Sequence, residues 1–183
     1  MFNFLCAYGV GGGRVVLAPV TRCRSLENLA QPHNALYYQQ RAAPGVLLIA
    51  EASAVSETAT GYPRVPGLWS DEQVDAWKPV VDAVHAKGAL FFCQLWHTGR
   101  NHSPATATAG CFIFGSFSSP VVIVPFSFVP RLLTIHVVGF DGPPPRLETD
   151  EIPEMVMDFR VAARNAIRAG NDHIKSIIPD QFV

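Results

Sequence analysis

Charged residues are sparse in this sequence, and neither sign predominates. Lys and Arg number 14 and Asp and Glu 15 among 183 residues, which gives a formal net charge of −1. The basic residues are scattered along the chain and form no stripe. Because a protein that binds a nucleic-acid backbone needs clustered basic side chains, no nucleic-acid partner is predicted.

Cysteine is also scarce, with four residues that include no CxxC pair and share no regular spacing: Cys6, Cys23, Cys93 and Cys111. This argues against a disulfide framework or a zinc site and predicts free thiols in a reducing compartment. Residues 1–13 are expected to be a leader, and they lack the basic stretch that opens a secretory signal. A cytoplasmic location is therefore predicted.

Several motifs of catalysis and cofactor binding are missing, among them G-x-S-x-G and H-E-x-x-H. The glycine cluster at residues 9–13 does not make a dinucleotide loop, because the third required glycine falls on Arg14 and no strand precedes it. His97 and His102 are five residues apart, which is not a helix-face spacing for zinc ligands. No metal site is predicted.

Residues 14–104 alternate between short apolar runs and helical patterns. The runs Arg14–Ala18, Val46–Glu51 and Ala89–Leu95 have the length of strands and are too short for helices. A helix is predicted from Pro32 to Ala43, since proline suits the first helical turn. Strands separated by helices in this way predict βαβ units and a parallel sheet.

The second predicted helix has a clear start and end. Ser70 and Gln73 form an S-x-x-Q capping box, in which each side chain satisfies the other residue's backbone N–H. An apolar face follows at spacings of three and four, and Gly88 supplies a left-handed residue after the helix. The residues of this face are Val74, Trp77, Val81 and Val84.

A fourth unit is predicted within residues 146–183. Thr149 or Asp150 is expected to cap a helix that ends at Gly170, with a strand at Ile174–Ile178 after it. The apolar side of this helix is predicted to comprise Ile152, Met155, Phe159, Ala162, Ala166 and Ile167. A complete (β/α)₈ TIM barrel needs about 250 residues. The predicted fold is therefore α/β, an incomplete (β/α)₈ barrel of about the first four βα units.

Residues 105–145 interrupt this pattern and are predicted to be an irregular apolar insertion. Within them, Cys111–Pro130 is uncharged over about the length of a membrane span. Pro120, Pro125 and Pro130 each remove a backbone hydrogen bond that lipid cannot replace, which argues against a membrane helix. A loop insertion is favoured over a transmembrane helix.

The ends of the predicted strands carry the candidate functional residues, since ligand chemistry in a parallel barrel gathers where strands end. The first strand is followed by Pro19, Val20, Thr21 and Arg22, the second ends in Glu51 and Ala52, and the third ends in Gln94, Leu95, Trp96 and His97. A hydroxyl, a small residue and an amide that converge suit a flat heteroaromatic ring with polar groups at its rim. The alternative is that Thr21 and Gln94 only cap strand ends.

Longer segments resemble one protein family. The segments are RVVLAPVTR, YYQQRAAPG, LIAEA, GLWSDEQVDAWKPVVDAVHAKG, FFCQLWHTGR and DFRVAARNAIRAG. Together they resemble the plant 12-oxophytodienoate reductases of the old yellow enzyme family, near-continuously over residues 14–104 and again over 146–172. The resemblance implies an FMN-bound barrel that passes hydride from NADPH to the β-carbon of an α,β-unsaturated carbonyl, in oxylipin and fatty acid metabolism.

The resemblance also implies roles for individual residues. Pro19, Val20 and Thr21 would line the isoalloxazine ring, and Ala52 would be the small residue against it. Gln94 matches a glutamine that pairs with the flavin pyrimidine. Trp96 matches a tryptophan that borders the substrate pocket. These six residues are the candidate cofactor and substrate site, and no catalytic residue is assigned.

The end of the sequence departs from the family pattern. Where the family has H-x-x-[HN]-G-Y-L, which supplies the clamp on the substrate carbonyl and the proton donor, this sequence reads HIKSIIPDQFV. The later arginine and phosphate loops of the family are unmatched as well. The expectation is a truncated member in which FMN binding and ene reduction are impaired. The competing hypothesis is a non-catalytic protein that docks on an intact relative. Nothing in the sequence indicates an oligomeric state.

Overall fold

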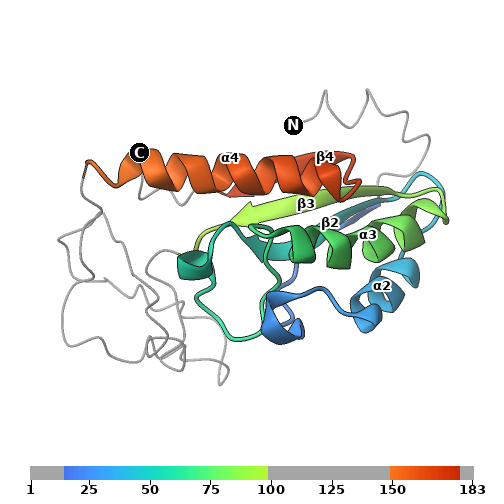
Figure 1. Ribbon diagram of the computed structural model, residues 1–183. Helices are drawn as coiled ribbons and strands as arrows, with labels where there is room; N and C mark the ends of the chain where they lie inside the picture. Colours follow the sequence, from blue (N-terminus) through green and yellow to red (C-terminus); the bar gives the residue numbers. More distant parts are fainter. Residues whose placement is uncertain (1–14, 99–148, 178–183) are drawn as a thin grey trace, which may run out of the picture.

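The computed structural model describes residues 15–98 and 149–177, and these form a parallel sheet covered by helices (Figure 1). The four strands lie in the order β1-β2-β3-β4, and every neighbouring pair is parallel. Their bounds are Val16–Leu17 (β1), Leu47–Ala54 (β2), Leu90–Trp96 (β3) and His173–Ile177 (β4). The prediction of a parallel sheet built from consecutive units is confirmed.

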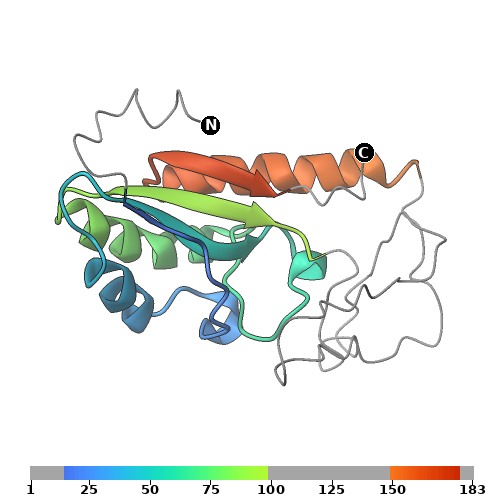
Figure 2. The same cartoon turned by 180° about the vertical axis from the view of Figure 1, so that it is seen from behind.

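Three α-helices connect these strands, and all of them lie on one face of the sheet (Figures 1 and 2). They are α2 (Pro32–Gln39), α3 (Asp71–His85) and α4 (Ile152–Arg168), and two short 3₁₀ helices, η1 (Leu26–Asn28) and η2 (Glu57–Ala59), lie in the loops. Sequential parallel strands with a helix in each connection are the pattern of a (β/α)₈ barrel. The fold is therefore α/β and corresponds to about the first four units of such a barrel. The predicted insertion at 105–145 lies outside the described residues.

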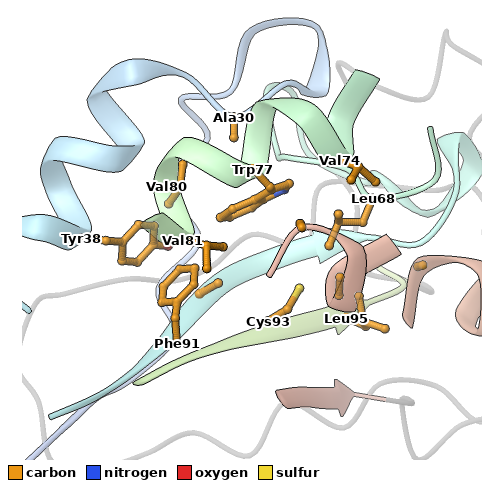
Figure 3. Close-up of a cluster of buried hydrophobic side chains, with 14 of the residues drawn as sticks. Ala30, Tyr38, Leu68, Val74, Trp77, Val80, Val81, Phe91, Cys93 and Leu95 are labelled. Atoms are coloured by element: carbon orange, nitrogen blue, oxygen red, sulfur yellow. The ribbon is translucent and has the colours of Figure 1, made fainter. Parts of the chain in front are cut away.

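The main hydrophobic core lies between α3 and the sheet (Figure 3). Trp77 and Val81 of α3 pack over Phe91, Cys93 and Leu95, which alternate along β3 on the helix side. All five side chains are at most 1% exposed. Burial of each large apolar side chain stabilises the fold by about 1.5–3 kcal/mol, so this layer fixes the position of β3 beneath the helix.

The start of α3 confirms the predicted capping box. The Gln73 backbone N–H donates to Ser70 Oγ (3.3 Å), and the Ser70 N–H donates to Gln73 Oε1 (3.2 Å). Gly88, three residues beyond the helix, has a φ of +72°. Both ends of this helix are therefore as the sequence predicts.

Helix α4 differs from its prediction. Its first flanking residue is Glu151, without a side-chain cap, so the assignment of Thr149 or Asp150 is wrong; a proline in the first turn starts the helix instead. Ile152 and Ile167 are 46% and 53% exposed rather than buried. Asn165 is buried in their place, because its amide donates to the Leu68 carbonyl (2.9 Å).

Strand β4 begins at His173, one residue before the predicted start at Ile174. No helix among the described residues is both long and apolar enough to cross a membrane.

Candidate functional site

A one-residue bulge in β2 arranges the centre of the candidate site. Strands β2 and β3 pair Ile49 with Phe92 and then Ala52 with Gln94, so β2 contains one more residue than β3 over this stretch. Ala50 and Glu51 consequently both face the helices. The bulge reverses the alternation and turns Ala52 to the opposite face of the sheet, directly beside Gln94. Bulges commonly re-aim side chains in this way next to functional sites.

The Gln94 side chain has an unusual environment. The residue is 5% exposed, and its Oε1 atom is buried and has no hydrogen-bond partner among the described residues. A buried carbonyl oxygen without a partner costs about 1–3 kcal/mol, so most such atoms are satisfied. Gln94 is therefore not explained as a strand-end cap, and its acceptor is available to an N–H donor from a ligand.

Arg22 and Glu51 form a buried ion pair immediately beside Ala52. Glu51 is fully buried, and its carboxylate accepts hydrogen bonds from the Arg22 backbone N–H and Nε (both 3.1 Å) and from Arg22 Nη2. The Asn34 amide of α2 donates to the same carboxylate (3.2 Å). The Arg22 guanidinium also lies over the ring of Tyr37, 3.8 Å from its centroid.

Two residues near this ion pair, Tyr38 and Cys23, have side chains whose pKa is raised. Burial raises the pKa of the Tyr38 hydroxyl, with a further contribution from the Glu51 carboxylate, and Tyr38 accepts a hydrogen bond from the Glu51 backbone N–H (2.8 Å). Burial and the same carboxylate raise the pKa of the Cys23 thiol. Neither group is therefore prepared to act as a nucleophile at neutral pH.

Trp96 ends β3 two residues after Gln94 and is partly exposed. Its indole stacks on the Tyr62 ring, with centroids 5.9 Å apart and planes inclined by 7°. The next residue, His97, is fully buried, and burial lowers the pKa of its imidazole to about 4. The stacked rings of Trp96 and Tyr62 form a fixed apolar surface at the carboxyl end of β3.

The predicted site residues are brought together to different degrees. Ala52 and Gln94 are direct partners in the sheet, and Trp96 follows at the same edge. Thr21 is connected to them through its neighbour Arg22, which binds Glu51 next to Ala52. Pro19 is partly exposed, and Val20 (57%) and Thr21 are exposed.

Two contacts of the site were not predicted from the sequence: the pairing of Arg22 with Glu51 and the stacking of Tyr62 on Trp96. The first had a signal, since Arg22 follows the first predicted strand and Glu51 of opposite charge ends the second, its parallel neighbour. The second had none, because Tyr62 lies in the loop between β2 and α3, whose path depends on tertiary contacts.

The residues present fit the ring expected from the sequence. A flavin ring presents an imide N–H, which an acceptor such as Gln94 Oε1 can bind, and a flat face, which a side chain as small as Ala52 can approach. Residues 15–98 and 149–177 contain no cluster of three potential metal ligands. Burial raises the pKa of Cys93 to about 12, so this thiol stays protonated.

Comparisons with known proteins show which family the chain is similar to. Residues 12–177 match the model of the NADH:flavin oxidoreductase / NADH oxidase family. The rice (Oryza sativa subsp. japonica) protein named 12-oxophytodienoate reductase 1 is 50% identical over 163 residues, which cover 88% of this chain and 40% of the rice protein. A second rice relative, also named as a 12-oxophytodienoate reductase, is 53% identical over 177 residues, or 93% of this chain and 46% of its own length.

Solved structures show the same relationship. Morphinone reductase superposes with a TM-score of 0.73 at 37% identity, covering 90% of this chain and 43% of that one. The old yellow enzyme homologue of Zymomonas mobilis gives 0.70 at 36% identity, covering 90% and 44%. The chain thus spans less than half the length of these proteins. A 166-residue family match, plant relatives at 50% and 53% identity and a shared fold together establish that the chain belongs to the NADH:flavin oxidoreductase / NADH oxidase family.

Proposed function

We propose that the carboxyl edge of this sheet is the ring-binding side of an FMN site in an ene reductase related to the 12-oxophytodienoate reductases. The observation that carries the proposal is the buried, unpartnered Oε1 of Gln94 directly beside Ala52. When bound, FMN would accept hydride from NADPH and deliver it to an α,β-unsaturated carbonyl. The substrate class, an oxylipin enone, is proposed from the names of the plant relatives.

Each residue has a proposed task. Gln94 accepts a hydrogen bond from the imide edge of the ring, and Ala52 leaves room for the ring to approach the sheet. Pro19, Val20 and Thr21 line the ring from the loop after β1, with the Thr21 hydroxyl as a donor to its polar rim. Trp96, held by its stack on Tyr62, borders the substrate and excludes water from one side.

The 183-residue polypeptide on its own is proposed to be a weak flavin binder without turnover. The phosphate loops that the resemblance implies are unmatched in this sequence, and the segment HIKSIIPDQFV lacks the clamp and the proton donor of the family pattern. A general acid and an electrostatic clamp each contribute roughly two or more orders of magnitude in rate. The phosphate of FMN forms strong charge-assisted hydrogen bonds where a site for it exists, and without such a site this contribution to affinity is lost.

Titration of the purified chain with FMN and with riboflavin tests this, using quenching of flavin fluorescence. Both ligands should bind with similar, weak affinity, since the ring alone is recognised. NADPH-dependent reduction of cyclohexenone should not exceed that of a heat-denatured control. If FMN binds at least about tenfold tighter than riboflavin, equivalent to about 1.4 kcal/mol, the chain holds the phosphate as well. That result would refute the proposal that only the ring is recognised.

A further inference from the structure

The contact between Arg22 and Glu51 fixes the backbone as well as the side chains. Glu51 accepts from the Arg22 backbone N–H at 3.1 Å in addition to the two guanidinium nitrogens. The main chain at residue 22 is thereby tied to the carboxyl end of β2. Thr21, which precedes it, and Cys23, which follows it with a φ of +54°, are held on either side of this attachment.

Stability does not account for a carboxylate at this place. Glu51 is 0% exposed, and taking an ion pair out of water offsets most or all of the attraction that it gains. The bulge nevertheless directs this side chain toward α2, where it meets Arg22 and Asn34. A regular strand would place residue 51 on the other face of the sheet and bring neither contact.

The surroundings hold both partners in one arrangement. Asn34 donates to Glu51 and, at 3.3 Å, to Ser25 Oγ. The Arg22 guanidinium lies over the rings of Tyr37 and Tyr38, at 3.8 and 5.0 Å from their centroids. Arg22 is only 11% exposed as a result. A guanidinium stacked on aromatic rings and paired with a carboxylate has little freedom to change its rotamer.

We propose that Glu51 is a positioning residue, which acts through Arg22 to hold the segment Pro19–Thr21 in register with Ala52 and Gln94. The proposal rests on the proposed function, because this segment would line the flavin ring. Ring recognition by several loops and strands requires their placement to within about half an ångström. The ion pair therefore serves the geometry of the site rather than the stability of the fold.

Hydrogen exchange of the full chain, followed for the peptide that contains residues 19–24, tests this together with riboflavin titration. Glu51→Gln should make the Arg22 amide exchange about tenfold faster, as expected for the loss of a charge-assisted hydrogen bond. Riboflavin affinity should fall by about the same factor. The double variant Glu51→Gln/Arg22→Met leaves no unpaired buried charge, so it should fold even where the single variant does not, and it should show the same two effects.

Asp172→Asn is the matched control. Asp172 likewise accepts from a backbone N–H, that of Phe91 (2.7 Å), and from a side-chain nitrogen, His85 Nε2 (2.8 Å), but at the amino end of the strands. It should alter neither the exchange of residues 19–24 nor riboflavin binding. If folded Glu51 variants exchange and bind as the wild type does, the positioning role is refuted while the proposed function stands. If the wild type binds no riboflavin, the proposed function fails. The exchange rates then decide the positioning role alone: faster exchange of residues 19–24 in the Glu51 variants means that Glu51 holds the segment, and unchanged exchange means that it does not.

Discussion

Ala52 and Gln94 are direct partners across β2 and β3 only because β2 carries one extra residue between Ile49 and Ala52. The bulge gives the two consecutive residues Glu51 and Ala52 opposite tasks. Glu51 binds the loop after β1 on the helix side, and Ala52 lies beside the unpartnered amide of Gln94 on the other side. A single local irregularity therefore builds both parts of the candidate site.

Replacement of Gln94 separates a ligand-binding role from a structural one. Gln94→Leu removes a buried acceptor that has no partner, so the free energy of unfolding should stay the same or rise by about 1 kcal/mol. Riboflavin binding should be lost. Urea denaturation and fluorescence titration of the same variant measure both effects, and a marked loss of stability would show that Gln94 serves as a strand-end cap.

Gln73→Leu provides the comparison for that experiment. Gln73 is also buried, but its Oε1 accepts hydrogen bonds from the backbone N–H groups of Trp69 (2.8 Å) and Ser70 (3.2 Å). Its replacement leaves these donors unsatisfied and should destabilise the chain by about 1–3 kcal/mol. Riboflavin affinity measured under folding conditions should not change.

The buried imidazole of His97 should make stability depend on pH. Its pKa is about 4 in the folded chain, because burial disfavours the charged form, and about 6.5 when unfolded. Between these values the unfolded state binds the proton and the folded state does not, so the contribution of His97 is fully present above pH 6.5 and is lost as the pH falls. Unfolding measured between pH 7.5 and pH 5 should show a loss of about 2 kcal/mol from this residue. His97→Gln should flatten the profile; an equally steep profile in the variant would assign the dependence to other groups.

Gly61 should tolerate no side chain. It has a φ of +56°, and a Cβ atom there would lie 2.1 Å from Thr98 Oγ1. Gly61→Ala combines backbone strain with overpacking and should cost about 2–4 kcal/mol. Gly45, with a φ of +77° and open space around the same position, isolates the backbone part, so Gly45→Ala should cost about 1 kcal/mol. Equal losses in thermal unfolding of the two variants would contradict the close approach of Thr98.

Much of the fold could be predicted from local patterns. The apolar runs of β2 and β3 and the capping box at Ser70 depend on neighbours in sequence, and the structure bears them out. Helix α4 was predicted less well, because its pattern of apolar residues cannot show which side faces the sheet. Asn165 is buried there by a bond to Leu68, 97 residues away in sequence.

The candidate site could likewise be predicted only in part. The residue types at the ends of the predicted strands, Thr21, Ala52 and Gln94, led to the prediction of a ring-binding site there. The bulge in β2 could not be predicted, since two consecutive residues on one face break the alternation by which strands are recognised. The hydrogen bonds between Glu51 and Arg22 depend on that bulge, so their geometry could not be predicted from the sequence either.

The central claim is that the carboxyl edge of the sheet recognises a flavin ring. Chemical-shift mapping with riboflavin tests this claim most directly. The ¹⁵N- and ¹³C-labelled chain would be titrated with riboflavin, and the Ala52 methyl and the Gln94 side-chain amide would be followed. Both signals should shift in a saturable manner, while the signals of His85 and Asp172 at the opposite edge should stay in place, and Gln94→Leu should abolish the Ala52 shift. Saturable shifts at His85 and Asp172 alone, or no shift at Ala52 and Gln94 at millimolar riboflavin, would contradict the proposed site.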